Sequence, residues 1–118
     1  MTAHQLIDEC MATLISVGQG HWGCDLVENF EPDLPTTSGL CQHTKRMILI
    51  SAKILDDDVE CKETILEECA HSLCPGDDLV GNHGLPFLAA VDFVREVNAK
   101  LTTESIKQLI EERYTRAY

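Results

Sequence analysis

A short segment with two adjacent acids and a histidine, TILEECAHSL at residues 64–73, has the residue types of a metal-dependent hydrolase. Glu67 and His71 are four residues apart, so on a helix they lie on one face and could bind the same metal ion. Glu68 lies about 100° around the helix from Glu67. From there a carboxylate can reach a water molecule beside the metal and accept its proton. The spacing therefore predicts a metal site with Glu68 as general base.

The segment differs by one residue from the zinc-binding pattern H-E-x-x-H. In that pattern two histidines on one helical face hold zinc, and the glutamate between them is the general base. Glu67 stands where the first histidine would be. Two histidines and one carboxylate form a known catalytic zinc set, and they also suit the facial triad of non-haem Fe(II). We therefore expect Zn²⁺, with another divalent transition metal as the alternative.

A third ligand is expected from the segment NHGLPF at residues 82–87. His83 returns after a short loop, which would give three protein ligands and leave a fourth position open for substrate or water. Cys74 lies on the same helical stripe as Glu67 and could replace or supplement a ligand. The alternative for Cys74 is a buried helix end, which its place just before Pro75 favours.

Each candidate residue also has an ordinary structural explanation. Adjacent acids such as Glu67 and Glu68 usually mark a solvated helix face, and His71 and His83 could be histidines without a ligand role. Cys69 points with the apolar residues of its helix and is expected in the core. Three other histidines have no partner at ligand spacing and are expected at the surface: His4, His21 and His43.

Four helices are predicted from apolar periodicity and capping residues. The first should begin after Thr2, whose side chain would form a capping box with that of Gln5, and should end at Gly18. The helix with the candidate site is expected over residues 59–74, capped from the acidic run at 56–58. Two further helices should begin at Asn82 or His83 and at Thr102 or Thr103. In the third helix the expected core residues are Phe87, Leu88, Val91, Phe93, Val94 and Val97.

Between the first two helices, β-type residues predict a small three-stranded sheet. One strand is expected within residues 21–30, and a hairpin over 40–51 turns at 43–45. The run at 47–50, MILI, is the most apolar and should lie inside the sheet. The fold class expected for residues 1–118 is therefore α+β in a single domain.

Composition and charge narrow the classes of partner. The chain of 118 residues has nine Lys and Arg against twenty Asp and Glu, a net charge of −11. Direct nucleic-acid binding and anionic-lipid binding are disfavoured, because both need clustered basic residues. No segment is apolar enough to span a membrane, and the N-terminal residues carry acids where an export signal would be apolar. We therefore expect a cytoplasmic protein whose six cysteines are reduced.

Three motifs in sequence order resemble the SprT-like (Spartan-type) zinc metallopeptidases. They are SGLCQHTKRMILIS, TILEECAHSL and NHGLPF, and the similar region covers about residues 34–97. In that family a G-x-C hairpin and a strand precede an H-E-x-x-H helix, and an H-G-x-x-F motif supplies the third zinc ligand. The resemblance implies a minimal zincin-like domain, with an N-terminal helix, a small sheet, the active-site helix and two C-terminal helices.

Carried over residue by residue, the resemblance implies His71 and His83 as zinc ligands and Glu68 as general base. It implies that Phe87 anchors the core behind the site. Position 67 departs from the family pattern, because Glu67 replaces a histidine. The cysteine-rich zinc ribbon that often follows this domain in the family has no counterpart in the sequence. With the acidity of the chain, its lack argues against a DNA-coupled role.

The expected function is metal-dependent hydrolysis of peptide bonds in a protein or peptide substrate. Glu67, His71 and His83 would bind the metal, and Glu68 would move the proton. The alternative is an inactive pseudopeptidase that keeps the fold and binds a partner protein through its acidic surface. A weaker third idea is that the acidic surface mimics nucleic acid.

Overall fold

The computed structural model describes residues 1–28, 30, 37–74 and 85–116. They form four helices, a short 3₁₀ helix and a mixed sheet of three strands, which confirms the α+β class. In chain order the elements are α1 (Ala3–Ser16), β1 (Gly23–Val27), β2 (Gly39–Gln42), β3 (Met47–Ser51), the 3₁₀ helix η1 (Ala52–Ile54), α2 (Asp58–Ser72), α3 (Leu85–Ala99) and α4 (Thr103–Arg116). None of the described helices is long and apolar enough to cross a membrane.

The sheet has the order β1-β3-β2, with β3 in the middle as its apolar run predicted. β2 and β3 pair antiparallel across a turn over residues 43–46, and Arg46 takes a positive φ of 52° there. β1 pairs with β3 in parallel, with Gly23 opposite Met47, which the sequence did not predict. Among the described strands, β1 and β2 are therefore the two edge strands.

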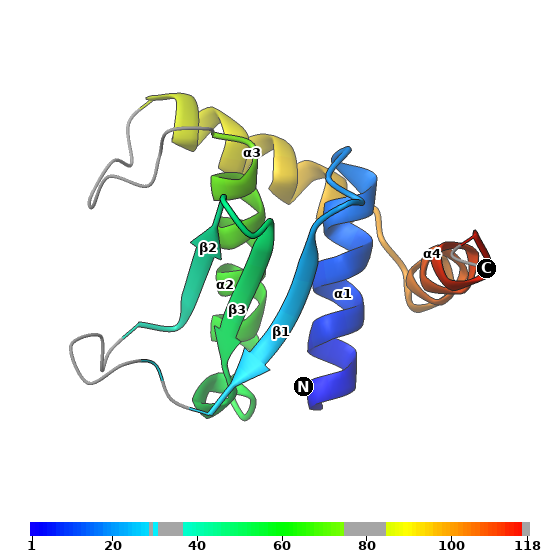
Figure 1. Ribbon diagram of the computed structural model, residues 1–118, viewed down its shortest axis with the longest axis horizontal. Coiled ribbons are helices and arrows are strands. Elements are labelled where there is room, and N and C mark those ends of the chain that lie inside the picture. Colours follow the sequence, from blue (N-terminus) through cyan, green and yellow to red (C-terminus); the bar gives the residue numbers. More distant parts are fainter. Residues whose placement is uncertain (29, 31–36, 75–84, 117–118) are drawn as a thin grey trace.

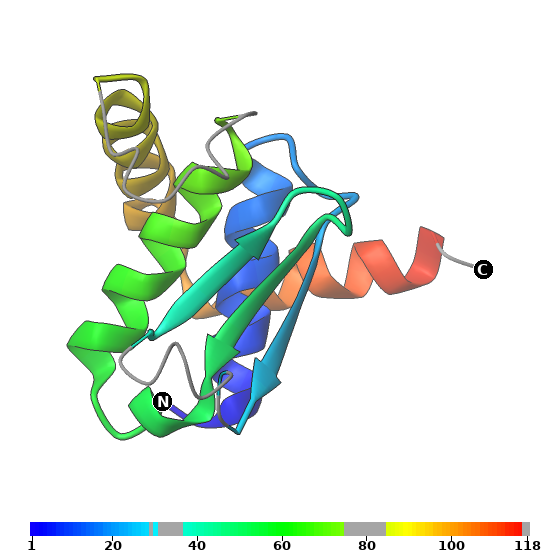
Figure 2. The same ribbon diagram turned by 60° about the vertical axis from the view of Figure 1, so that its left-hand side comes forward.

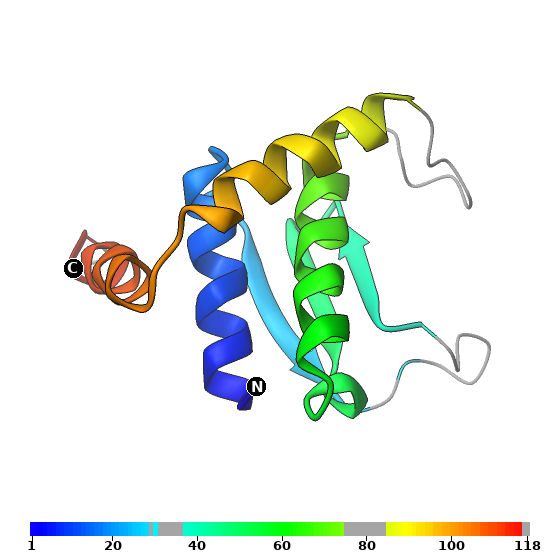
Figure 3. The same ribbon diagram turned by 180° about the vertical axis from the view of Figure 1, so that it is seen from behind.

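Helices α1 and α2 cover one face of the sheet (Figures 1 and 3). Helix α3 runs across one end of these two helices. No described helix covers the opposite face (Figure 2). The alternation along β3 places Ile48 and Ile50 toward the helices, where both are fully buried. Leu6 and Leu14 of α1 and Ile65 of α2 close the core around them, also with no exposed surface.

Local capping explains where the helices begin and end. Thr2 and Gln5 form the predicted capping box at the start of α1, and Gly18, with φ of 88°, lies just past its end. Asp57 caps α2 by accepting a hydrogen bond from the backbone N–H of Glu60 at 3.1 Å. Thr102 accepts one from the Ser105 N–H at the start of α4, also at 3.1 Å. The predicted caps of these three helices are thus confirmed.

The predicted core face of α3 is wrong at two positions. Phe87 and Val94 are buried, but Leu88 and Phe93 are 52% and 48% exposed. The reason is geometric: α3 packs along the stripe that contains Phe87, Val94 and Asn98, and residues 88 and 93 lie off it. The expected start at Asn82 or His83 lies outside the described residues.

A buried polar contact joins α1 to α3. The Asn98 side-chain amide donates to Thr13 Oγ1 at 3.0 Å, and both residues are at least 95% buried. Next to it, Lys62 of α2 donates to Glu9 Oε2 at 2.8 Å. These contacts fix α1, α2 and α3 relative to one another, and α2 carries the candidate site.

Candidate functional site

The three candidate residues on α2 lie in three different environments. Glu67 is exposed, His71 is partly buried, and Glu68 is only 6% exposed. The rotation of about 100° per residue produces this difference, because Glu68 turns toward the sheet while Glu67 turns toward solvent. The ordinary explanation of the two acids as one solvated face is therefore wrong for Glu68.

Glu68 is enclosed between α2 and the first residue of β2. A Cβ atom built on Gly39 would come within 2.8 Å of Glu68 Cγ, so the strand backbone lies directly against this side chain. Oε2 of Glu68 is buried and has no hydrogen-bond partner among the described residues. Burial first, and then the neighbouring charge of Glu67, raises the pKa of Glu68 to about 8. Without a cation nearby, the carboxyl is therefore mostly protonated at pH 7.

His71 is held by an aromatic contact with α3. Its ring stacks on Phe87, with centroids 4.3 Å apart and planes inclined by 29°. Phe87 is 5% exposed and belongs to the core, so it is a rigid support for the imidazole. The contact places the start of α3 beside the last turn of α2.

The proposed third ligand, His83, lies outside the described residues, as does Gly84 of the same motif. Cys74 and Pro86, on either side of residues 75–84, are in contact, with the Cys74 thiol 3.8 Å from the Pro86 carbonyl oxygen. Among the described residues, no three His, Cys, Asp or Glu side chains are grouped to hold a metal ion. Cys74 therefore does not complete a three-ligand set with Glu67 and His71.

The other described histidines and Trp22 belong to segments other than α2. His4 and His21 are exposed as predicted, and His4 pairs with Asp8 at 3.1 Å. His43 differs from the prediction because it is partly buried, with its ring edge-on to Trp22 at 5.4 Å. Trp22 is itself buried in the core, 4% exposed.

Three thiols from three elements meet in the core beside α2. Cys10 of α1 is hydrogen-bonded to Cys24 of β1 and to Cys69 of α2. The hydrogen bond with Cys24 lowers the pKa of Cys10, but the bond with Cys69 and burial outweigh it and hold the pKa well above its usual range. The hydrogen bond with Cys10, and then burial, raise the pKa of Cys24. Cys69 is in the core as predicted, but spacing along the chain could not reveal this cluster.

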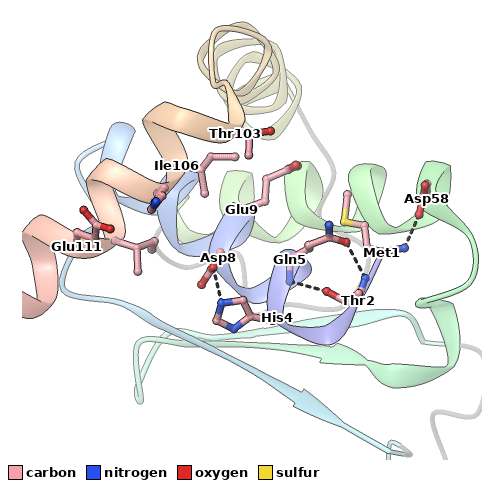
Figure 4. A pocket seen from close by; sticks show the side chains of 12 residues that line it. Met1, Thr2, His4, Gln5, Asp8, Glu9, Asp58, Thr103, Ile106 and Glu111 are labelled. Carbon is pink, nitrogen blue, oxygen red and sulfur yellow. Dashed lines mark hydrogen bonds and ion pairs between the residues drawn. The ribbon is translucent and has the colours of Figure 1, made fainter.

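A cavity of about 790 Å³ lies elsewhere, between α1 and α4 (Figure 4). Its lining includes none of Glu67, Glu68 or His71. Its acids already have partners: Asp8 pairs with His4, Glu9 with Lys62, and Asp58 with the amino group of Met1. The cavity is thus separate from the candidate site.

Comparisons with models of protein families, with curated proteins and with solved structures found no match.

Proposed function

We propose that this protein is a zinc-dependent peptidase of the SprT-like type, with a zincin-like domain. The observation that carries the proposal is the carboxyl group of Glu68, which is buried without a hydrogen-bond partner among the described residues. Burying such a group costs free energy, so an unpartnered carboxyl with a raised pKa favours a functional role over a structural one.

The arrangement around Glu68 supports the zincin-like assignment. α2 lies against the sheet, and β2, one of its two edge strands, runs antiparallel to β3 directly beside the Glu68 side chain. The proposed general base is therefore at the edge of the sheet. A substrate held along that edge would pass next to it.

The metal would be held by Glu67 and His71 from α2, together with His83. Carboxylate and imidazole are suitable zinc donors, and the exposure of Glu67 leaves that side of the site open to an ion from solvent. The stacking of Phe87 would fix the orientation of the His71 ring. Zinc bound there would polarise the scissile carbonyl and acidify a water molecule.

Glu68 would move the proton. Opposite a dication its carboxyl would ionise at neutral pH, because a nearby positive charge favours the charged form. Oε2 could then accept a proton from the attacking water and pass it to the leaving amine. Oε2 has no hydrogen-bond partner among the described residues, so its lone pairs would be available to accept that proton.

The outer edge of β2 at Gly39 would bind an extended peptide. The Ser51 N–H donates to the Ser38 carbonyl oxygen at 2.8 Å, and hydrogen-bonded pairs alternate along an antiparallel ladder. By this alternation the backbone groups of Gly39 point away from β3. They could pair with a substrate strand, which Gly39 would place beside Glu68.

Metal content and turnover test the proposal together. Protein purified without chelator or metal-affinity resin should contain about one zinc per chain, and His71→Ala should lose it. Glu68→Gln should keep the metal and lose peptidase activity, because the amide cannot accept the proton. No bound zinc and none taken up on addition, or full activity of Glu68→Gln, would contradict the proposal.

The exposed carboxylate at position 67 favours a second candidate, a pseudopeptidase that binds a protein partner through its acidic surface. Glu67→His separates the two. If the natural chain binds no zinc and this substitution creates both binding and activity, the protein is a binding module. If the substitution leaves zinc affinity similar or lowers activity, Glu67 is a functional ligand.

A further inference from the structure

Gly39 occupies the closest approach between the sheet and α2. A Cβ atom at this position would lie 2.8 Å from Glu68 Cγ, 2.8 Å from Thr64 Cγ2 and 3.2 Å from Glu68 Cδ. Carbon atoms in contact are normally 3.5–4.0 Å apart. Even the methyl group of alanine would therefore require β2, Thr64 or Glu68 to move.

Glycine is not required here for its backbone freedom. Among the described glycines only Gly18 has a positive φ, and Gly39 lies in a strand that pairs regularly with β3. The requirement at position 39 is therefore space alone. Glu68 Cγ and Cδ and Thr64 Cγ2, from two side chains of α2, occupy that space.

Of the groups around Gly39, the Glu68 side chain is the one most able to move. Thr64 is β-branched and 6% exposed, so its methyl group has few other positions. The β2 backbone is tied to β3 along its length. Glu68 has three side-chain torsions, and no described residue makes a hydrogen bond to its Oε2. A side chain at position 39 would thus displace the Glu68 carboxyl.

We propose that Gly39 is the positioning residue for Glu68: the space left by its missing side chain holds the Glu68 stem and sets where the carboxyl lies beside β2. The expected loss of turnover when Gly39 is replaced rests on the proposed function. The expected displacement of the Glu68 carboxyl does not. A displacement of about 1 Å at a reacting group can lower turnover about 100-fold.

Gly23 provides a matched control at the opposite edge of the sheet. A Cβ atom there would meet Met47 Cε at 2.8 Å and Sδ at 3.1 Å, which is as close as the contact at Gly39. Those atoms are the far end of a flexible side chain, which can turn aside at small cost. Gly23→Ala is therefore the same glycine-to-alanine change in an edge strand, but at a position where the new methyl group does not contact Glu68.

The experiment compares Gly39→Ala with Gly23→Ala by three measurements. The ¹³C NMR signal of the Glu68 carboxyl, at one fixed pH, should shift in Gly39→Ala and stay in place in Gly23→Ala. The urea midpoint should fall more for Gly39→Ala, and that loss should shrink in a Thr64→Ser, Glu68→Ala background, where both contacting groups are gone. Turnover should fall about 100-fold in Gly39→Ala, with KM and zinc content unchanged.

These measurements separate the inference from the proposed function. If neither the natural protein nor any variant cleaves peptides, the proposed function fails, while the NMR shift and the stability comparison still decide the role of Gly39. An unmoved Glu68 signal in Gly39→Ala would overturn the positioning role. So would an equal loss of stability in both backgrounds, because positions 39 and 68 would then be uncoupled.

Discussion

Phe87 stacks on His71, with their ring centroids 4.3 Å apart, and this contact joins the core of α3 to the end of α2. One residue of the pair is buried and the other is a candidate metal ligand. Packing in the core therefore determines how far the His71 imidazole can rotate. If His71 binds a metal as proposed, the contact would make metal affinity sensitive to a residue that does not touch the ion.

Replacing Phe87 with leucine should weaken metal binding. The smaller side chain removes the flat support of His71, and loss of such outer support typically lowers metal affinity about 10- to 100-fold. The measurement is zinc affinity by competition with a chelating dye. Phe93→Leu is the control, because Phe93 is on the same helix but 48% exposed, and it should leave affinity unchanged. Equal affinities in the two variants would contradict the supporting role.

The raised pKa of Glu68 should make the metal-free protein less stable as pH rises. In the folded state the carboxyl keeps its proton up to about pH 8, whereas the unfolded chain loses it near the ordinary value of 4.5. Between these values the folded state binds one more proton, so this group lowers the unfolding free energy by about 1.4 kcal/mol per pH unit as pH rises. Above the folded pKa the contribution stops changing.

Urea unfolding of Glu68→Gln at pH 5.5 and pH 7.5, with chelator present, measures this effect. The natural protein should lose more stability between the two values than the variant, which has no proton to release. Glu96→Gln is the control, because Glu96 is 73% exposed and should leave the natural pH dependence in place. The same pH dependence in all three proteins would show that Glu68 titrates normally.

Removing the buried amide of Asn98 should destabilise the fold without affecting the site. Asn98→Ala leaves the Thr13 hydroxyl without this donor and opens a small cavity, at a cost of about 1–3 kcal/mol. The unfolding free energy from urea titration gives the value. Lys100→Ala, at an exposed position two residues away, should change it by less than about 0.5 kcal/mol. Zinc content should be the same in both variants.

The buried thiols should be protected from alkylation in the folded protein. Cys10 and Cys69 have no exposed surface, and burial with mutual hydrogen bonding keeps Cys10 in its unreactive protonated form. Mass spectrometry after brief iodoacetamide treatment should find both unmodified in buffer and modified in urea. Rapid labelling of Cys10 in buffer would mean that α1 opens from the core.

The sequence predicted which helices and strands form better than it predicted which side of each helix is buried. The capping box at Thr2 and the central position of β3 were readable, because capping chemistry and a continuous apolar run are local signals. The exposure of Leu88 and Phe93 was not readable, since it depends on which side of α3 meets α1 and α2. When a helix has apolar residues on several sides, its sequence alone does not show which side is buried.

For the candidate site, sequence spacing correctly separated Glu67 from Glu68 around the helix. It could not predict that Glu68 is enclosed, because the enclosure comes from Gly39, which is distant in sequence. The glycine in the hairpin motif was the available signal. To recognise that this glycine makes room for Glu68, one must know that β2, and not β1, lies against this part of α2.

The parallel pairing of β1 with β3 has a consequence for the order of folding. Gly23 pairs with Met47 across a long stretch of chain, whereas Gln42 pairs with the same residue across a tight turn. Closing the shorter loop costs less entropy, so the β2–β3 hairpin should form early and offer its other edge as a template for β1. Pulse-labelled hydrogen exchange should then find the hairpin amides protected before those of β1. β1, which comes first in the chain, would then be the last strand to join the sheet.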